Sequence, residues 1–92
     1  MTPVRFSNQT DRALFEILTH IAEDDPAAAM GLIEDLQRRV VQTLSQFPDA
    51  GPRVAGGQRV MVVRGYAFLY RHDAGRDEVV VLDVFGPGMD WR

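Results

Sequence analysis

The first half of the chain carries two stripes of apolar side chains with a helical period. The first stripe consists of Leu14, Ile17, Leu18 and Ile21. The second consists of Ile33, Leu36, Val40, Leu44 and Phe47, widened by Ala29 and Leu32. Side chains three and four residues apart share one face of a helix, so the pattern predicts helices over residues 8–23 and 26–46. We expect the first stripe to be buried, together with Ile33, Leu36, Val40 and Leu44 of the second.

Signals for helix starts agree with these two stripes. Ser7 or Asn8 can cap the first helix, because a short polar side chain accepts hydrogen bonds from free N–H groups there. Asp25 can cap the second, and Pro26 suits the first helical position, where no N–H is needed. The short link between the helices predicts an antiparallel helical hairpin. A short apolar strand, "PVRF", precedes it.

The second half of the chain changes to a pattern of loops and strands. Residues 48–57, "PDAGPRVAGG", read as a loop. Strand-like runs follow at residues 58–63, 66–72 and 78–85, and links of hairpin length join them. The sequence therefore predicts a single α+β domain over residues 1–92. In it, a strand and the helical hairpin precede a three-stranded antiparallel meander, and the helices pack on one face of the sheet.

The predicted strands are apolar on both faces. In the last strand, Val79, Val81 and Phe85 flank Asp83 on one face, and Val80, Leu82 and Val84 occupy the other. Antiparallel sheets usually have one solvated, polar face, and two helices cover only one face. The pattern favours a second apolar face that binds a partner. The alternative is that the helices and the loop at residues 48–57 wrap around to bury both faces.

Composition and charge limit the classes of function. The chain has 92 residues, no cysteine and a formal net charge of −3. Acidity counts against a general nucleic-acid binder, which would need a basic surface. Between residues 50 and 72, however, the only charged residues are Arg53, Arg59, Arg64 and Arg71. Arginine binds carboxylates and phosphates with two parallel hydrogen bonds, so this run suits recognition, although it is also compatible with ordinary surface charge.

Several kinds of site find no support in the sequence. His20 and His72 share no ligand spacing and there is no cysteine, so we expect no metal. Gly56-Gly57 precedes a strand rather than a helix, which argues against a phosphate loop, and we expect no cofactor. No apolar stretch has the length of a signal peptide or membrane span, so we expect a cytoplasmic protein that does not contact membranes.

Three segments resemble the RelE/ParE superfamily of toxins from type II toxin–antitoxin systems. They are "FSNQTDRALFEILTHIAEDDPAAA", "LSQFPDAGPR" and "RVMVVRGYAFLYR", the last through Arg59, Tyr66 and Tyr70. The resemblance spans nearly the whole chain. It implies a stable toxin, encoded on a plasmid or chromosome, that is held inactive by an antitoxin. The extended or helical C-terminal segment of such an antitoxin wraps the toxin and is often acidic.

The C-terminal stretch "FGPGMDW" bears on which branch the chain resembles. In the superfamily the last strand commonly runs into His-Gly-x-x-Arg-Asp-Trp or similar. Here Phe85 stands where His is common and Met89 where Arg is common, whereas Gly86, Asp90 and Trp91 keep the pattern. The RelE branch cleaves messenger RNA on the ribosome, and neither Phe nor Met transfers a proton. The resemblance therefore favours the ParE branch, whose members inhibit DNA gyrase.

Two tyrosines and one arginine are weak candidates for a cleaving site. Tyr66 and Tyr70 lie four residues apart on a strand and share a face, so they are either core aromatics or acid–base groups beside Arg59 or Arg64. Arg59 matches a position of the family pattern, but a structural ion pair with Asp83 is an equal alternative. Trp91 is either a lid on the core or an anchor for a partner.

Together these observations predict a non-catalytic toxin that inhibits DNA gyrase and forms a hetero-oligomer with a ParD-like or similar antitoxin. Nucleic acid would be contacted only through the antitoxin. The residues expected to contact the antitoxin or the target are Arg53, Arg59, Arg64, Arg71, Phe85, Met89 and Trp91. The alternatives are a RelE-like, ribosome-dependent endoribonuclease and an attenuated toxin that acts mainly in an autorepressing complex.

Overall fold

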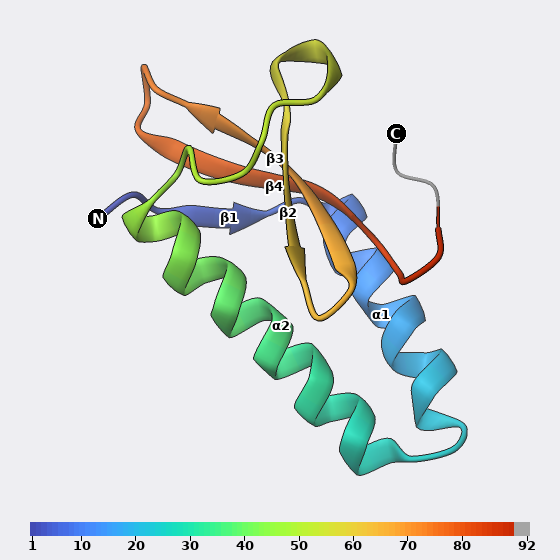
Figure 1. Ribbon diagram of the computed structural model, residues 1–92. Coiled ribbons are helices and arrows are strands. Elements are labelled where there is room, and N and C mark those ends of the chain that lie inside the picture. Colours follow the sequence, from blue (N-terminus) through green and yellow to red (C-terminus); the bar gives the residue numbers. More distant parts are fainter. Residues whose placement is uncertain (90–92) are drawn as a thin grey trace.

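The computed structural model, which describes residues 1–89, is a helical hairpin packed on a four-stranded sheet (Figure 1). Its elements are β1 (Val4–Phe6), α1 (Asn8–Ala22), α2 (Pro26–Gln46), a short 3₁₀ turn (Ala55–Gly57), β2 (Arg59–Val63), β3 (Tyr66–Asp73) and β4 (Glu78–Phe85). The α+β class and the order of elements agree with the sequence prediction. Trp91 and Asp90 lie outside the described residues.

Side-chain caps explain why both helices begin where the sequence predicts. The Ser7 hydroxyl accepts a hydrogen bond from the Thr10 N–H at 3.1 Å. The Thr10 hydroxyl in turn donates to the carbonyl of Val81 at 2.8 Å, which fixes the start of α1 against β4. Asp25 accepts from the Ala28 N–H at 3.0 Å, and Pro26 follows it in the first turn of α2. These local signals satisfy N–H groups that have no partner inside the helix.

The sheet has the strand order β1-β4-β3-β2 and is mixed. The three later strands form the predicted antiparallel meander. However, β1 pairs in parallel with β4, in the register Val4↔Val79 to Phe6↔Val81. The sheet is therefore not purely antiparallel. The register between β3 and β4 also shifts between Leu69 and Tyr70, which is a bulge that the sequence pattern did not reveal.

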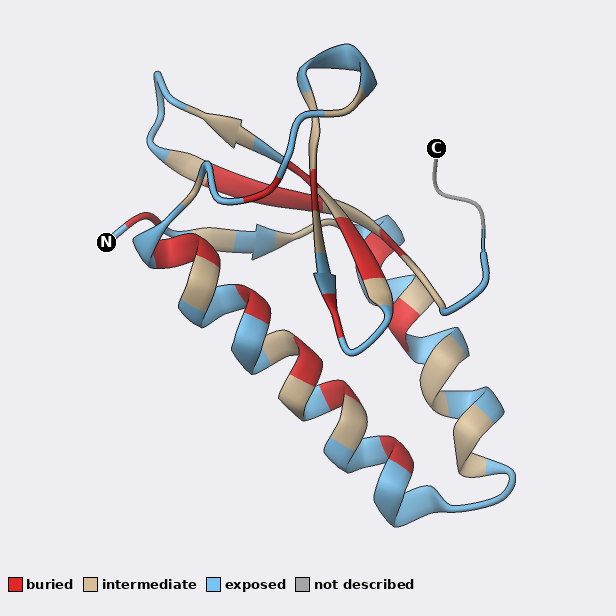
Figure 2. Ribbon diagram, in the orientation of Figure 1, coloured by how far each residue is buried: buried red, intermediate tan, exposed pale blue. Residues whose placement is uncertain are grey.

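The core lies between α2 and the inner face of the sheet (Figure 2). Its fully buried members include Leu36, Val40 and Leu44 of α2 and Phe68 and Tyr70 of β3. The predictions for Leu14 and Ile33 are also confirmed.

The burial predicted for the rest of the first stripe is wrong. Ile17, Leu18 and Ile21 are only partly buried. The reason is geometric: α1 contacts α2 on one side and β4 on another, and its C-terminal half extends past the end of the sheet (Figure 1). Side chains there are covered from one direction only. The partly exposed stripe therefore becomes one wall of a surface groove.

The outer face of the sheet is covered in part. Val60, Ala67 and Val80 alternate onto this face and are buried, although no helix lies over them. The loop before β2 covers Val60, since the Val60 N–H donates to the carbonyl of Pro52 at 3.1 Å. Val62, two residues along, is 57% exposed. The loop before β2 thus buries part of this face, as the second interpretation predicted, while the exposure of Val62 leaves the predicted partner surface a prediction. Among residues 1–89, no helix is long and apolar enough to cross a membrane.

Candidate functional site

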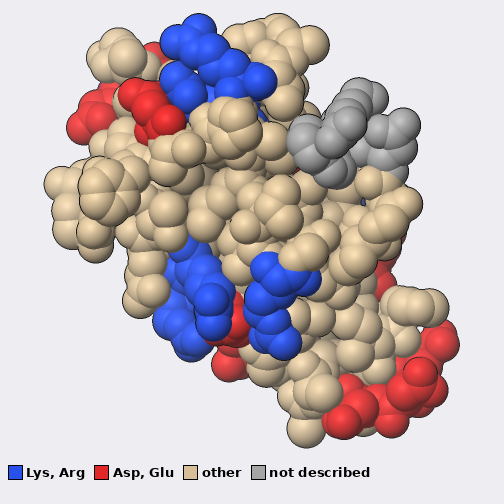
Figure 3. Space-filling model, viewed as in Figure 1, with Lys and Arg blue, Asp and Glu red and all other residues tan. Residues whose placement is uncertain are grey.

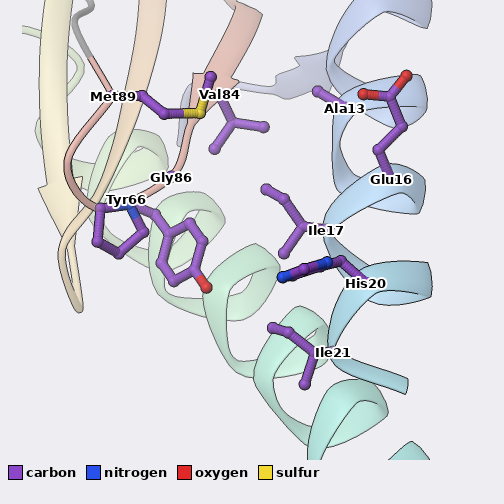
Figure 4. Close-up of a pocket in the computed structure, with 10 residues that line it drawn as sticks. Ala13, Glu16, Ile17, His20, Ile21, Tyr66, Val84, Gly86 and Met89 are labelled. Atoms are coloured by element: carbon purple, nitrogen blue, oxygen red, sulfur yellow. The ribbon is translucent and has the colours of Figure 1, made fainter. Parts of the chain in front are cut away.

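An apolar groove lies between α1 and the end of β4, with a volume of about 410 Å³ (Figure 4). We call it the α1 groove. Its lining residues are Ala13, Glu16, Ile17, His20, Ile21, Tyr66, Val84, Gly86, Pro87 and Met89. Ile17, His20 and Ile21 point from α1 toward Tyr66 on the opposite wall (Figure 4). The walls are mainly apolar and the polar groups are few, which suits an apolar segment of a partner better than a small polar ligand.

The turn after β4 places Met89 in the α1 groove. Gly86, Pro87 and Gly88 end the strand as the sequence predicts. The N–H of Met89 donates to the carbonyl of Gly86 at 3.1 Å, and Gly88 has a φ of 82°, which glycine adopts without strain. The chain therefore bends back toward α1. Met89 is 60% exposed and offers a flexible apolar side chain at the groove.

A second cluster lies where the loop after α2 returns to the sheet. We call it the loop latch, and it comprises Asp49, Gly51, Arg59, Tyr70 and His72. An η nitrogen of Arg59 donates to the carbonyl of Gly51 at 2.8 Å and to that of Asp49 at 3.2 Å. The Asp49 carboxylate lies 3.5 Å from Arg59 Nε and 2.9 Å from His72 Nδ1. The hydrogen bond from His72 lowers the pKa of the Asp49 carboxyl, and Arg59 and Arg53 add to the effect.

The ion pair that we considered between Arg59 and Asp83 is not formed. Asp83 accepts from the backbone N–H of Val84 at 2.8 Å instead. Two features of the sheet explain this. Arg59 pairs with Tyr70 in the register and Asp83 with Leu69, and successive residues of β3 point to opposite faces. In addition, β3 lies between the strands that carry the two side chains.

Tyr70 is the buried centre of the loop latch. Its side chain is fully buried, and its hydroxyl accepts a hydrogen bond from the Gly51 N–H at 2.9 Å. Burial raises the pKa of the Tyr70 hydroxyl, so this group stays protonated at neutral pH. A Cβ at Gly51 would lie 2.3 Å from the carbonyl oxygen of Val60, and therefore only glycine fits there. The Tyr70 hydroxyl therefore holds the loop after α2 against the sheet.

The weak candidates for a cleaving site do not converge. Tyr66 and Tyr70 share a face as predicted, but four residues of strand separate them by roughly 13 Å. Arg59 lies beside Tyr70, with its guanidinium bonded to the loop. Tyr66 instead lines the α1 groove. The three residues therefore belong to two different regions.

The run of arginines is also divided among different surfaces. Arg71 pairs in the register with Val80 and is exposed on the outer face. Arg53 is exposed beside the start of β2. Arg64, in the turn after β2, contacts α2. Phe85 pairs with Ala67 at the edge of the outer face and is partly exposed. The residues predicted to contact partners are thus spread over the molecule, and the place of Trp91 lies outside the described residues.

An arginine cluster on α2 was missed by the sequence analysis. Arg38, Arg39 and Arg64 all contact the carboxylate of Asp35, with Arg39 Nε at 2.9 Å and an η nitrogen of Arg64 at 3.2 Å. The hydrogen bond from Arg39, with a further one from Arg64, lowers the pKa of Asp35. The sequence did contain a signal for this cluster, because Arg38 and Arg39 follow Asp35 by three and four residues and therefore lie on the same helix face. Figure 3 shows these basic side chains as two blue groups beside a small red surface, over α2 and the lower end of β2.

The two histidines take different places. His20 lines the α1 groove and His72 belongs to the loop latch, where its Nε2 lies 3.7 Å from Asp77. Within residues 1–89, no three His, Asp or Glu side chains come together in a way that could hold a metal ion.

Comparisons with solved structures show where this fold occurs. A chain from the chromosomal ParDE toxin–antitoxin system of P. aeruginosa is 18% identical, with a TM-score of 0.80, and the match covers 95% of this chain and 97% of that one. A chain of the RelBE2 complex from Mycobacterium tuberculosis is 24% identical, with a TM-score of 0.66 and coverage of 96% and 93%. The isolated E. coli RelE toxin is 14% identical, with a TM-score of 0.66 and coverage of 99% and 89%. No curated protein sequence gives a significant match.

The family assignment rests on the sequence as well as the fold. Residues 4–91 match the family described as "ParE toxin of type II toxin-antitoxin system, parDE". This match spans nearly the whole chain, and it agrees with the family resemblance found in the sequence. The chain therefore belongs to the ParE toxin family of type II toxin–antitoxin systems.

Proposed function

We propose that this toxin inhibits DNA gyrase by binding it, without cutting nucleic acid, and that a cognate antitoxin neutralises it. The observation that carries the proposal is that Arg59 and Tyr70 hold the loop after α2 in place, and this argues against a cleaving site. A ribonuclease needs groups that are free to move a proton and to stabilise charge on a phosphate. Here the Arg59 guanidinium is bonded to Asp49 and Gly51, and the Tyr70 hydroxyl is buried.

The end of β4 supports the same proposal. Phe85 and Met89 occupy positions where the superfamily commonly has His and Arg, and neither side chain transfers protons or carries charge. Met89 lines an apolar groove rather than a polar cleft. The net charge of −3 also disfavours docking on ribosomal or messenger RNA, because phosphate contacts supply most of such affinity.

The α1 groove supports an antitoxin as the partner. Its walls are mainly apolar, and several large apolar side chains there are partly exposed. Covering such a surface with an apolar segment stabilises both chains, by about 25 cal/mol for each Å² buried. One solved neighbour comes from a toxin–antitoxin system, ParDE, and another from a toxin–antitoxin complex, RelBE2. A gyrase inhibitor acts in the cytoplasm, so the proposal also places this toxin there.

Induction of the chain alone in a sensitive bacterial cell tests the target. We expect a DNA-damage response with filamentation, and rescue by co-expression of the neighbouring antitoxin gene. Cuts at codon positions in translated messages would contradict the proposal and favour a RelE-like ribonuclease. Normal growth at a high level of folded protein would also contradict it and favour an attenuated toxin.

A further inference from the structure

His72 lies between two carboxylates, and its side chain is only 14% exposed. Its Nδ1 lies 2.9 Å from Oδ1 of Asp49, in the loop after α2. Its Nε2 lies 3.7 Å from Oδ1 of Asp77, in the turn before β4. Among residues 1–89, this Nε2 is the one fully buried side-chain nitrogen or oxygen without a hydrogen bond. The ring therefore has a carboxylate oxygen near each of its nitrogens.

Neither neutral form of the His72 imidazole suits these neighbours. A neutral imidazole has one N–H donor and one bare nitrogen that only accepts. With the proton on Nδ1, the bare Nε2 faces Asp77. With the proton on Nε2, the bare Nδ1 lies 2.9 Å from the Asp49 carboxylate, and two acceptors at that distance repel each other. The imidazolium has an N–H on both nitrogens, so it alone matches both oxygens.

The surroundings of Asp49 contain other cations. Arg59 of β2 lies 3.5 Å from the Asp49 carboxylate, and Arg53 of the same loop also lowers the pKa of Asp49. These two arginines share Asp49 with His72. Tyr70 lies on the same face of β3 two residues earlier, and it stays neutral because burial raises the pKa of its hydroxyl. Asp49 therefore keeps part of its support when His72 loses its charge.

The surroundings of Asp77 are different. In the described part of the chain, no arginine forms an ion pair with Asp77, and His72 is the cation that faces it. The nearby acids Asp73 and Glu78 pair with each other in the register and point to the opposite face from His72. The contact with Asp77 thus depends directly on the charge of His72.

We propose that His72 is a pH-sensitive clasp, which as an imidazolium ties the loop after α2 to the turn before β4 and on deprotonation loosens that loop. The clasp reaches the N-terminal segment too, because the Thr2 hydroxyl donates to Oδ1 of Asp77 at 2.9 Å. Figure 1 shows these three segments at the same end of the sheet. The clasp does not depend on the target of the toxin.

The direction of the pH effect follows from the charges. Imidazole ordinarily changes charge between pH 5 and pH 8, whereas aspartate does so near pH 4. The clasp is therefore closed where His72 is charged and the carboxylates are ionised, and it is lost as pH rises through the titration of His72. The hydrogen bond between Gly51 and Tyr70 does not use His72 and remains. The loop should thus open more often at higher pH without detaching permanently.

The loop after α2 covers apolar surface, which gives its opening a consequence. Val60 is 3% exposed, and its N–H donates to the carbonyl of Pro52 in that loop. Val62, which shares the outer face with Val60, is already 57% exposed. Opening of the loop would uncover Val60 beside Val62. The clasp therefore controls how much of the outer face is apolar and accessible.

The test follows the full chain by NMR from pH 5.5 to pH 9. The ring signals of His72 report its proton, and the amides of Gly51 and Val60 report the loop. We expect both amide shifts to change with the same midpoint as the His72 ring. The protection factor of the Gly51 amide, corrected for the intrinsic exchange rate, should fall about threefold to tenfold across that midpoint, because a charge-assisted contact is lost.

The two histidines provide a matched pair of variants, since the chain has no others. His72→Gln keeps an N–H donor but carries no charge, so the loop amides should no longer depend on pH over this range. His20→Gln removes the ring in the α1 groove and should leave the dependence unchanged. Circular dichroism checks that both variants are folded.

Asp77→Asn tests the second carboxylate in a chain that retains His72. Asparagine tolerates the positive φ of 49° at this position, so the turn should keep its shape. Removing the negative charge should move the midpoint of the His72 titration to lower pH, by about half a unit. This variant decides the matter even if His72→Gln does not fold.

Three results would overturn the inference. The first is a His72 ring that keeps one charge state from pH 5.5 to pH 9. The second is a Gly51 amide whose protection does not change across the His72 midpoint, or changes equally in folded His72→Gln. The third is an unchanged His72 midpoint in Asp77→Asn. None of these results bears on inhibition of gyrase, so the proposed function would still stand.

Discussion

Tyr66 and Tyr70 lie four residues apart on one face of β3, and yet they belong to very different regions. The Tyr70 hydroxyl is buried and bonded to Gly51 in the loop latch. Tyr66 is partly exposed and lines the α1 groove. The difference comes from what covers each end of the strand: the loop after α2 closes one end, and the other lies beside the incompletely covered α1. A residue that matches the family pattern can thus have a structural role, as Tyr70 does, while the exposed groove lies at the other end of the strand.

The largest effect is expected from a substitution in the core that supports both the loop latch and the α1 groove. Leu36 is fully buried in the core that α2 shares with Tyr70. Leu36→Ala should lower the free energy of unfolding by about 2–5 kcal/mol, because it removes buried methyl groups and leaves a cavity. Urea unfolding measures this change. A loss below 1 kcal/mol would show that the helix pair does not pack as described.

A change at Gly51 should affect the loop latch alone. Gly51→Ala places a Cβ against the carbonyl of Val60, and backbone atoms cannot yield as a flexible side chain can. We expect a loss of roughly 1–3 kcal/mol or more, as for other overpacked sites. Gly75→Ala is the matched control, since its nearest neighbour in another residue is 3.5 Å away. Equal stability of the two variants would contradict the close packing of the loop.

The matched pair Tyr70→Phe and Tyr66→Phe sharpens the comparison most directly. Tyr70→Phe leaves the buried N–H of Gly51 without its acceptor, which should cost about 1–3 kcal/mol. In the described residues the Tyr66 hydroxyl makes no hydrogen bond within the protein, so Tyr66→Phe should change stability by less than about 0.5 kcal/mol. Thermal and urea unfolding of both variants give the difference. A larger loss of stability for Tyr66→Phe than for Tyr70→Phe would contradict the structural role of the Tyr70 hydroxyl.

The smallest expected effect is the dependence of stability on pH. The pKa of Asp49 is lowered in the folded state, chiefly by the hydrogen bond from His72. Its contribution to stability is therefore full above the unfolded pKa of about 3.9 and is lost as pH falls through the lower folded pKa. Asp49→Asn should flatten the acid limb of a stability curve measured from pH 7 to pH 2. An unchanged acid limb would show that the pairing with His72 contributes nothing.

Local signals made much of the fold predictable from the sequence. The caps at Ser7 and Asp25 and the proline after Asp25 involve only near neighbours, so both helix starts were predicted correctly. The turn at Arg64 and Gly65 is equally local. In contrast, β1 pairs with β4 across more than seventy residues, and the periodicity of one strand contains no information about its partner or its direction.

The candidate site was harder to predict for the same reason. Arg59 is bonded to backbone carbonyls of the loop, and any residue supplies a carbonyl, so no side-chain pattern reveals such a partner. Asp83 was a candidate ion-pair partner for Arg59 because it is charged, but the two side chains lie on opposite faces of the sheet. The partial exposure of Ile17 and Ile21 also depends on which elements fail to cover α1, and its stripe cannot show that.

The central claim is that this toxin inhibits gyrase by binding. The most direct measurement adds the purified chain to gyrase, ATP and relaxed plasmid and follows supercoiling, alone and with the purified antitoxin. We expect a dose-dependent fall in supercoiling that the antitoxin reverses, and no cutting of messenger RNA in a parallel translation reaction. Full supercoiling at saturating toxin, together with cuts at codon positions in the message, would contradict the account.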